Sequence, residues 1–138
     1  MILRENVFID TGAWVALADR DDDCHRQAAS VYPSLLKSCK ALVTSNLVVA
    51  EAYVLLLHAL GHTEAVSFLE KMHASPRILK IYSNEEIESN AKDILMKYTD
   101  QDFCYTDAVS FSIMRMQRIE KVFCFDKHFL TAGFVRIP

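Results

Sequence analysis

Short apolar runs, each too brief to form a helix, recur along the chain with longer helical patterns between them. They occupy residues Val7–Ile9, Ala41–Thr44, Ile78–Tyr82, Val122–Phe125 and Phe134–Ile137. Continuous apolar runs of this length are typical of strands that are buried on both faces, and such strands occur in parallel sheets covered by helices. The pattern therefore predicts an α/β fold in three layers, with a central, mostly parallel sheet of about five strands.

The segments between these runs have the period of helices. They lie near residues 12–19, 25–39, 46–60, 62–74, 84–98 and 106–118. Asn84 and Thr106 are the predicted N-caps of the last two helices. The terminal stretch "FVRIP" is predicted to be an edge strand. Because 138 residues is the usual size of one domain, residues 1–138 are expected to form a single domain.

Composition and local signals indicate a cytoplasmic protein without a membrane span. Hydrophobic residues make up 51% and charged residues 24%, and no apolar run approaches the roughly 20 residues of a membrane span. The first residues, Met1–Asn6, lack the pattern of an export signal. The four cysteines form no C-x-x-C pair and are expected to be reduced, buried and apolar in role: Cys24, Cys39, Cys104 and Cys124.

Two predicted strands end in a carboxylate. In "VFIDTGAW", residues 7–14, Asp10 directly follows the first apolar run, and Asp126 directly follows "VFCF". A charge taken out of water costs several kcal/mol unless a partner compensates it. Ligands of parallel sheets bind at the carboxyl ends of the strands, so both acids would face one crevice if their strands are neighbours. For either acid alone, helix capping is the simpler interpretation.

Two further acids stand in predicted helices at positions where burial is expected. Glu51 is the one formally charged residue in "TSNLVVAEAYVLLLHALGH", and a helix that is apolar almost all round is expected to be buried. Asp107 shares a helix face with Phe111 and Met114, at i+4 and i+7, and so points inward. A helix N-terminus favours a carboxylate by ~0.3–1 kcal/mol, which supports capping by Asp107 as strongly as catalysis.

Together these four carboxylates indicate a metal site. No four basic residues are placed to neutralise them, and like charges held close together would otherwise bind protons. Hard divalent cations with oxygen ligands resolve this conflict. Two such ions, about 3.5–4 Å apart, would activate a water and stabilise the leaving oxygen of a phosphodiester. The formal net charge of −3 does not decide the substrate class, because bound divalent ions would reverse the sign of the site.

These motifs resemble a known family. The stretches "VFIDTGAWVAL", "ALVTSNLVVAEAYVLL" and "YTDQDFCYTDAVSFSIMRMQRIEKVFCFDKHFLTAGF" are similar, in this order, to PIN-domain ribonucleases of the VapC type, the toxins of toxin–antitoxin pairs. The resemblance covers essentially the whole chain and implies a PIN-like α/β/α sandwich. It implies that Asp10, Glu51, Asp107 and Asp126 form the catalytic metal site, with Asp10 and Asp107 as direct ligands.

The same resemblance implies a function and its partners. It implies Mg²⁺ or Mn²⁺ as cofactor, attack of water on an RNA phosphodiester, a homodimer, and a small antitoxin whose C-terminal segment blocks the site. Thr11 and Ser45 resemble hydroxyl positions that support the site, and Asp100 matches a recurrent acid upstream of Asp107.

The sequence also supports structural interpretations of two further residues and two alternative functions. His128 is interpreted as a structural residue beside Phe129, and Asp102 as a solvated loop acid. One alternative is a catalytically silent PIN-fold module that binds RNA or protein. The other is a phosphoaspartate protein, either a phosphatase or a receiver. Such phosphatases have a second Asp two residues after the first, where this chain has Gly12.

Overall fold

A computed structural model describes residues 4–138. Residues 1–3, which carry part of the expectation that no export signal is present, lie outside the described residues. The elements follow in the order β1 Val7–Ile9, α1 Thr11–Ala18, α2 His25–Ser38, β2 Leu42–Ser45, α3 Asn46–Leu60, α4 His62–Ala74, β3 Ile78–Ile81, α5 Glu85–Lys97, α6 Tyr105–Gln117, β4 Lys121–Phe123, α7 His128–Thr131 and β5 Val135–Ile137.

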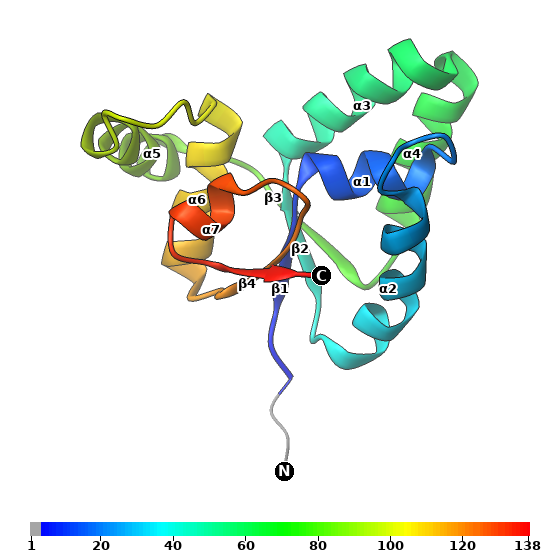
Figure 1. Ribbon diagram of the computed structural model, residues 1–138, viewed down its shortest axis with the longest axis horizontal. Coiled ribbons are helices and arrows are strands. Elements are labelled where there is room, and N and C mark those ends of the chain that lie inside the picture. Colours follow the sequence, from blue (N-terminus) through cyan, green and yellow to red (C-terminus); the bar gives the residue numbers. More distant parts are fainter. Residues whose placement is uncertain (1–3) are drawn as a thin grey trace.

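The five strands form one parallel sheet in the order β3-β2-β1-β4-β5. The chain builds outward from β1 to β3, then returns past β1 to add β4 and β5 on its other side. Figure 1 shows α1–α4 on one side of the sheet and α5–α7 on the other. The predicted three-layer α/β fold is therefore confirmed. The change of direction at β1 places the carboxyl ends of β1 and β4 side by side, where Ile9 pairs with Phe123, and ligands of parallel sheets bind at such points.

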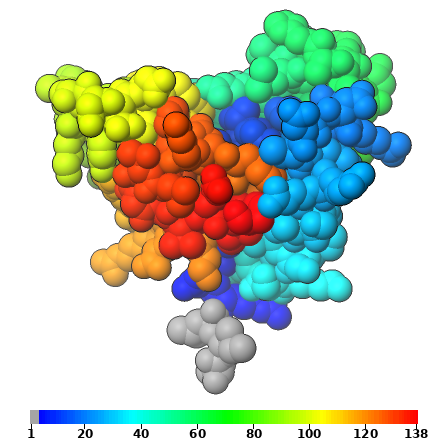
Figure 2. All heavy atoms as spheres, viewed as in Figure 1, coloured from blue at the N-terminus to red at the C-terminus, as the bar shows by residue number. Residues whose placement is uncertain are grey.

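The central strands are buried because both faces of the sheet are covered. All residues of β1 and β2 are buried, including Thr44 and Ser45 of β2. The edge strands β3 and β5 are partly exposed, and Val135 in β5 has an exposed fraction of 54%. On the face seen in Figure 2, the C-terminal segment with α7 and β5 lies between α5 and α2. The prediction of a terminal edge strand is confirmed.

Aromatic side chains fill the layer between the sheet and α5–α7. Phe111 of α6 is fully buried and meets Phe103 and Phe129 edge to face, with both centroid distances at 5.0 Å. On the other side of the sheet, Trp14 of α1 packs edge to face against Phe68 of α4, with centroids 5.7 Å apart. These clusters fix the helices that carry the acidic residues.

The predicted N-cap of α6 is wrong by two residues. Thr106 is not the N-cap but lies buried within the helix, and Cys104 is the N-cap instead. Its Sγ accepts a hydrogen bond from the Asp107 backbone N–H at 3.4 Å. The prediction that Asn84 caps α5 is confirmed, since its side chain accepts a hydrogen bond from the N–H of Ile87 at 2.9 Å. The short helix α7 was not predicted, because four residues do not display a helical period.

The expectation that α3 is buried all round is wrong. Val54 and Leu55 have exposed fractions of 46% and 49%, because α1, α4 and α6 cover only the other faces of the helix. The helix ends as predicted at Gly61, whose φ of +94° favours glycine. Within residues 4–138, no helix combines the length and the apolar character that a membrane crossing requires.

The expectation for the cysteines is correct in part. All four thiols are free, and Cys39 and Cys124 are buried. Cys24 is half-buried and Cys104 is exposed, so the prediction of uniform burial is wrong for these two. The reason for Cys104 is its capping role at the start of α6, at the surface.

Candidate metal centre

Asp10 lies at the carboxyl end of β1, next to the end of β4. Its backbone N–H donates to the Phe123 carbonyl at 3.1 Å, which extends the pairing of the two strands. Asp10 has an exposed fraction of only 6%, yet its side chain forms no capping hydrogen bond with α1. The capping interpretation of this side chain is therefore wrong, and the reason for its burial must lie elsewhere.

Burial and neighbouring acids change the ionisation of Asp10. The pKa of its carboxyl is raised from 3.8 to about 7, and the largest cause is burial. The nearby Thr11 backbone opposes this increase, whereas the negative charges of Asp107, Asp126 and Glu51, in that order of importance, contribute to it. The fold thus brings all four predicted acids within electrostatic range of one another, and Asp10 is held where a cation would stabilise its charged form.

Glu51 reaches the cluster from α3. Its Oε1 accepts a hydrogen bond from the Thr11 hydroxyl at 3.3 Å, so Thr11 orients this carboxylate as expected of a supporting residue. Ser45 acts on the helix rather than on the acids. It is fully buried and its Oγ accepts the backbone N–H of Val48 at 3.1 Å, which caps α3.

Asp107 caps helix α6 and also belongs to the cluster of four acids. Its Oδ2 accepts the backbone N–H of Cys104 at 3.2 Å and so completes a capping box at the start of α6. Asp107 is buried, with an exposed fraction of 6%, on the face that also buries Phe111 and Met114. The prediction that it points inward is confirmed, and one oxygen serves both the helix and the site.

Asp126 lies in the loop after β4 rather than directly at its end, since the strand stops at Phe123. The predicted strand, Val122–Phe125, thus ended two residues too late. The Oδ1 of Asp126 accepts the backbone N–H of His128 at 2.8 Å, which fixes the carboxylate at the start of α7. Its side chain is 38% exposed, so this acid forms the open side of the cluster.

His128 was missed by the sequence analysis, which placed it in the core beside Phe129. Its Nδ1 lies 3.0 Å from Asp107 Oδ2 and 3.4 Å from Asp126 Oδ2. Its Nε2 lies 3.2 Å from Asp102 Oδ1. Burial lowers the pKa of His128, but the hydrogen bond to Asp107 and the charges of the surrounding acids raise it by more. The sequence signal that could have pointed to His128 is its position two residues after Asp126.

The two loop acids before α6, Asp100 and Asp102, differ in their contacts with the site. Asp100 is exposed and forms no hydrogen bond or ion pair with the four acids within residues 4–138, whereas Asp102 contacts His128 although its own side chain is 95% exposed. The supporting role of Asp100 stays a prediction, whereas Asp102, interpreted from the sequence as a solvated loop acid, lies against the site.

The donor atoms suit a divalent cation. Asp107, Asp126 and His128 each offer one ligand atom, and these atoms lie within 4.8 Å of one another. In the part of the chain that the structure describes, neither lysine nor arginine forms an ion pair with Asp10, Glu51, Asp107 or Asp126. Buried carboxylates without a cationic partner fit a bound metal ion.

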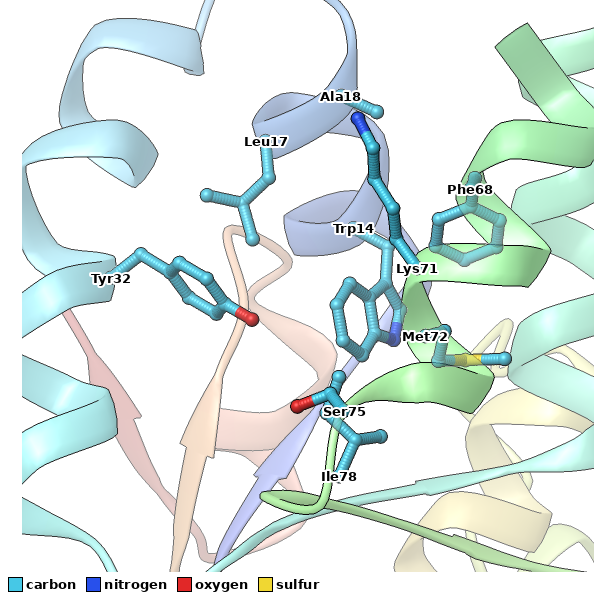
Figure 3. Close-up of a pocket in the computed structure, with 9 residues that line it drawn as sticks. All are labelled: Trp14, Leu17, Ala18, Tyr32, Phe68, Lys71, Met72, Ser75 and Ile78. Atoms are coloured by element: carbon cyan, nitrogen blue, oxygen red, sulfur yellow. The ribbon is translucent and has the colours of Figure 1, made fainter. Parts of the chain in front are cut away.

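A mostly apolar hollow beside α1 is a separate feature. Figure 3 shows it between α1, α2 and α4, where Trp14, Tyr32 and Phe68 line a cavity of about 240 Å³. Lys71 is the charged residue of this lining, and the described lining holds no carboxylate. The acidic cluster, not this cavity, has the chemistry of a metal centre.

Comparison with known proteins identifies the family. The PIN domain family matches residues 7–135. The chain belongs to the PIN-domain family. Curated relatives of this PIN domain include the 23S rRNA-specific endonuclease VapC20 from two strains of Mycobacterium tuberculosis. Each is 30% identical over 131 residues, which cover 95% of this chain and 97% of the relative.

Solved structures agree with this assignment. The crystal structure of M. tuberculosis VapC20, described as a toxin that cleaves the sarcin–ricin loop, superposes with a TM-score of 0.88 at 29% identity and covers 95% of this chain and 98% of its own. FitAcB from Neisseria gonorrhoeae has a TM-score of 0.67 at 17% identity, with 96% of each chain covered, and shows the fold alone. The PIN domain is thus VapC-like in sequence and in structure.

Proposed function

We propose that this PIN domain is a metal-dependent endoribonuclease, the toxin of a toxin–antitoxin pair, and that the 138-residue chain is one domain. The observation that carries the proposal is Asp10, which is 6% exposed, raised in pKa by burial and by three acids, and free of any ion pair with lysine or arginine among the described residues. The activity named for VapC20, on 23S rRNA, supports RNA as the substrate.

Four carboxylates would hold the cofactor: Asp10, Glu51, Asp107 and Asp126. Bound Mg²⁺ or Mn²⁺ would supply a water of lowered pKa and stabilisation of the charge on the phosphate. The protein's own contribution is orientation. Thr11 fixes the carboxylate of Glu51, and the capping box fixes Asp107, so the acids are placed before RNA arrives.

The proposal is tested with RNA that contains the sarcin–ricin loop, incubated with the protein in Mg²⁺, in Mn²⁺ and in EDTA. We expect cleavage with either metal, none in EDTA, and a loss of at least about 10²-fold in Asp10→Asn. Asp93→Asn is the matched control, because this acid is exposed on α5 and its loss should leave cleavage unchanged.

Two outcomes would contradict the proposal. Cleavage that survives both EDTA and Asp10→Asn would refute the metal mechanism. Binding of RNA without cleavage in any metal would favour the alternative of a silent PIN-fold module.

The proposal also includes the partners of the protein and its location in the cell. We propose a homodimer that covers the exposed apolar side chains Val54 and Leu55 of α3, which lie beside Glu51 around a hollow of about 370 Å³. A small antitoxin and a cytoplasmic location are proposed from the toxin named for VapC20. Light scattering should give a dimer mass for the parent and a monomer mass for Leu55→Glu, and a dimeric Leu55→Glu would place the interface elsewhere.

A further inference from the structure

The ring of His128 occupies a position that a metal ligand would take. Its Nδ1 is 3.0 Å from Asp107 Oδ2 and 3.4 Å from Asp126 Oδ2. Adjacent ligands of an octahedral ion with bonds of 2.1 Å are about 3.0 Å apart. The two separations from Nδ1 are close to this value, and one ligand atom from each of the three residues lies within 4.8 Å of the other two.

The surroundings of the ring fix its orientation. On its outer side, Nε2 lies 3.2 Å from Asp102 Oδ1, and the ring meets Phe103 edge to face with centroids 5.2 Å apart. The backbone N–H of His128 is held by Asp126 Oδ1 at 2.8 Å. A histidine whose far nitrogen donates to a carboxylate presents the lone pair of its near nitrogen, which is the common arrangement behind metal-binding histidines.

We propose that His128 is a nitrogen ligand of the metal centre and makes this site select Mn²⁺ over Mg²⁺. The inference rests on the proposed function, since it assigns a ligand to the same centre. Mg²⁺ takes oxygen ligands and keeps much of its water, whereas imidazole suits first-row transition metals. A site of carboxylates alone would have a smaller preference, because carboxylates suit both ions. Asp102 acts as a positioning residue, because it contacts the ring and not the cluster.

The test measures metal binding by the full chain, without RNA. Metal-free protein is titrated with Mn²⁺, followed by electron paramagnetic resonance, and pulsed measurements then detect ¹⁴N coupled to the bound ion. A competing titration with Mg²⁺ gives the selectivity. His128→Asn is the key variant, because its amide can place an oxygen near the position of Nδ1 while removing the imidazole.

We expect ¹⁴N coupling in the parent and none in His128→Asn. The preference for Mn²⁺ over Mg²⁺ should fall by at least about tenfold in His128→Asn. Asp102→Asn should keep the ¹⁴N coupling but weaken Mn²⁺ binding by up to about tenfold. Asp93→Asn, at an exposed position of α5, is the matched control and should bind as the parent does.

The outcomes separate this inference from the proposed function. If Mn²⁺ binds, and Asp10→Asn weakens it, but no ¹⁴N coupling is seen in the parent, the role of His128 is overturned and the acidic metal centre stands. The same holds if His128→Asn keeps the parent's selectivity. If Mn²⁺ does not bind the parent, or binds equally well to Asp10→Asn and Asp107→Asn, the metal centre itself is refuted and this inference with it.

Discussion

Asp10→Asn is expected to stabilise the metal-free protein at neutral and alkaline pH. Asp10 is 6% exposed and burial, together with the three other acids, raises its pKa from 3.8 to about 7. The folded carboxyl therefore holds a proton between about pH 4 and pH 7 that the unfolded chain releases. The free energy of unfolding falls as pH rises through this range, because the folded state must release a proton that it binds more tightly.

The size of this loss of stability follows from the pKa shift of Asp10. A difference of ~3 pKa units at 1.36 kcal/mol per unit amounts to ~4 kcal/mol of lost stability above pH 7. Asparagine has nearly the same shape and keeps an acceptor oxygen, but it carries no charge. The variant should therefore be more stable than the parent at pH 8 by a substantial part of this ~4 kcal/mol, and the two should converge near pH 4.

The assay is urea denaturation in EDTA from pH 4 to pH 8, repeated with Mn²⁺. Asp93→Asn serves as the control and should follow the parent at every pH. Added Mn²⁺ should stabilise the parent at pH 8 and leave Asp10→Asn almost unchanged, because binding to the folded state alone is stabilising. If Asp10→Asn is instead less stable than the parent at pH 8 without metal, Asp10 has a structural role and the reasoning fails.

Three other substitutions test separate parts of the structure. Phe111→Ala should destabilise the protein by ~3–5 kcal/mol in urea denaturation, since this ring is fully buried among aromatic neighbours; a loss below ~1 kcal/mol would contradict that packing. Ser45→Ala should cost ~1 kcal/mol through loss of the α3 cap, with Mn²⁺ affinity unchanged as measured by calorimetry; a selective loss of affinity would place its hydroxyl at the metal. Lys127→Glu, beside Asp126, should weaken RNA binding and reduce the salt dependence of the binding constant by about one phosphate contact, whereas Lys37→Glu, near the opposite edge of the sheet, should not. Equal effects of the two charge reversals in a filter-binding assay would mean that neither lysine contacts the RNA specifically.

The layers of the fold were predictable because their signals are local. Each strand of the sheet appears as a short apolar run, and Asn84 and Gly61 mark helix ends through their own backbone chemistry. The start of α6 was misplaced because the cap is a cysteine, Cys104, a residue type outside the usual capping set. The exposure of Val54 and Leu55 was not predictable, since the composition of α3 does not show which faces its neighbours cover.

The four acids were selected from the sequence because each carboxylate stands in an apolar context. The contacts that these acids form could not be predicted, because they join residues far apart in the chain. Thr11 meets Glu51 across 40 positions, and Asp102 meets His128 across 26. Sequence alone therefore determined the succession of strands and helices along the chain and the burial of Asp10 and Asp107. Only the tertiary structure decided what faces them, because strand order and helix packing bring distant side chains together.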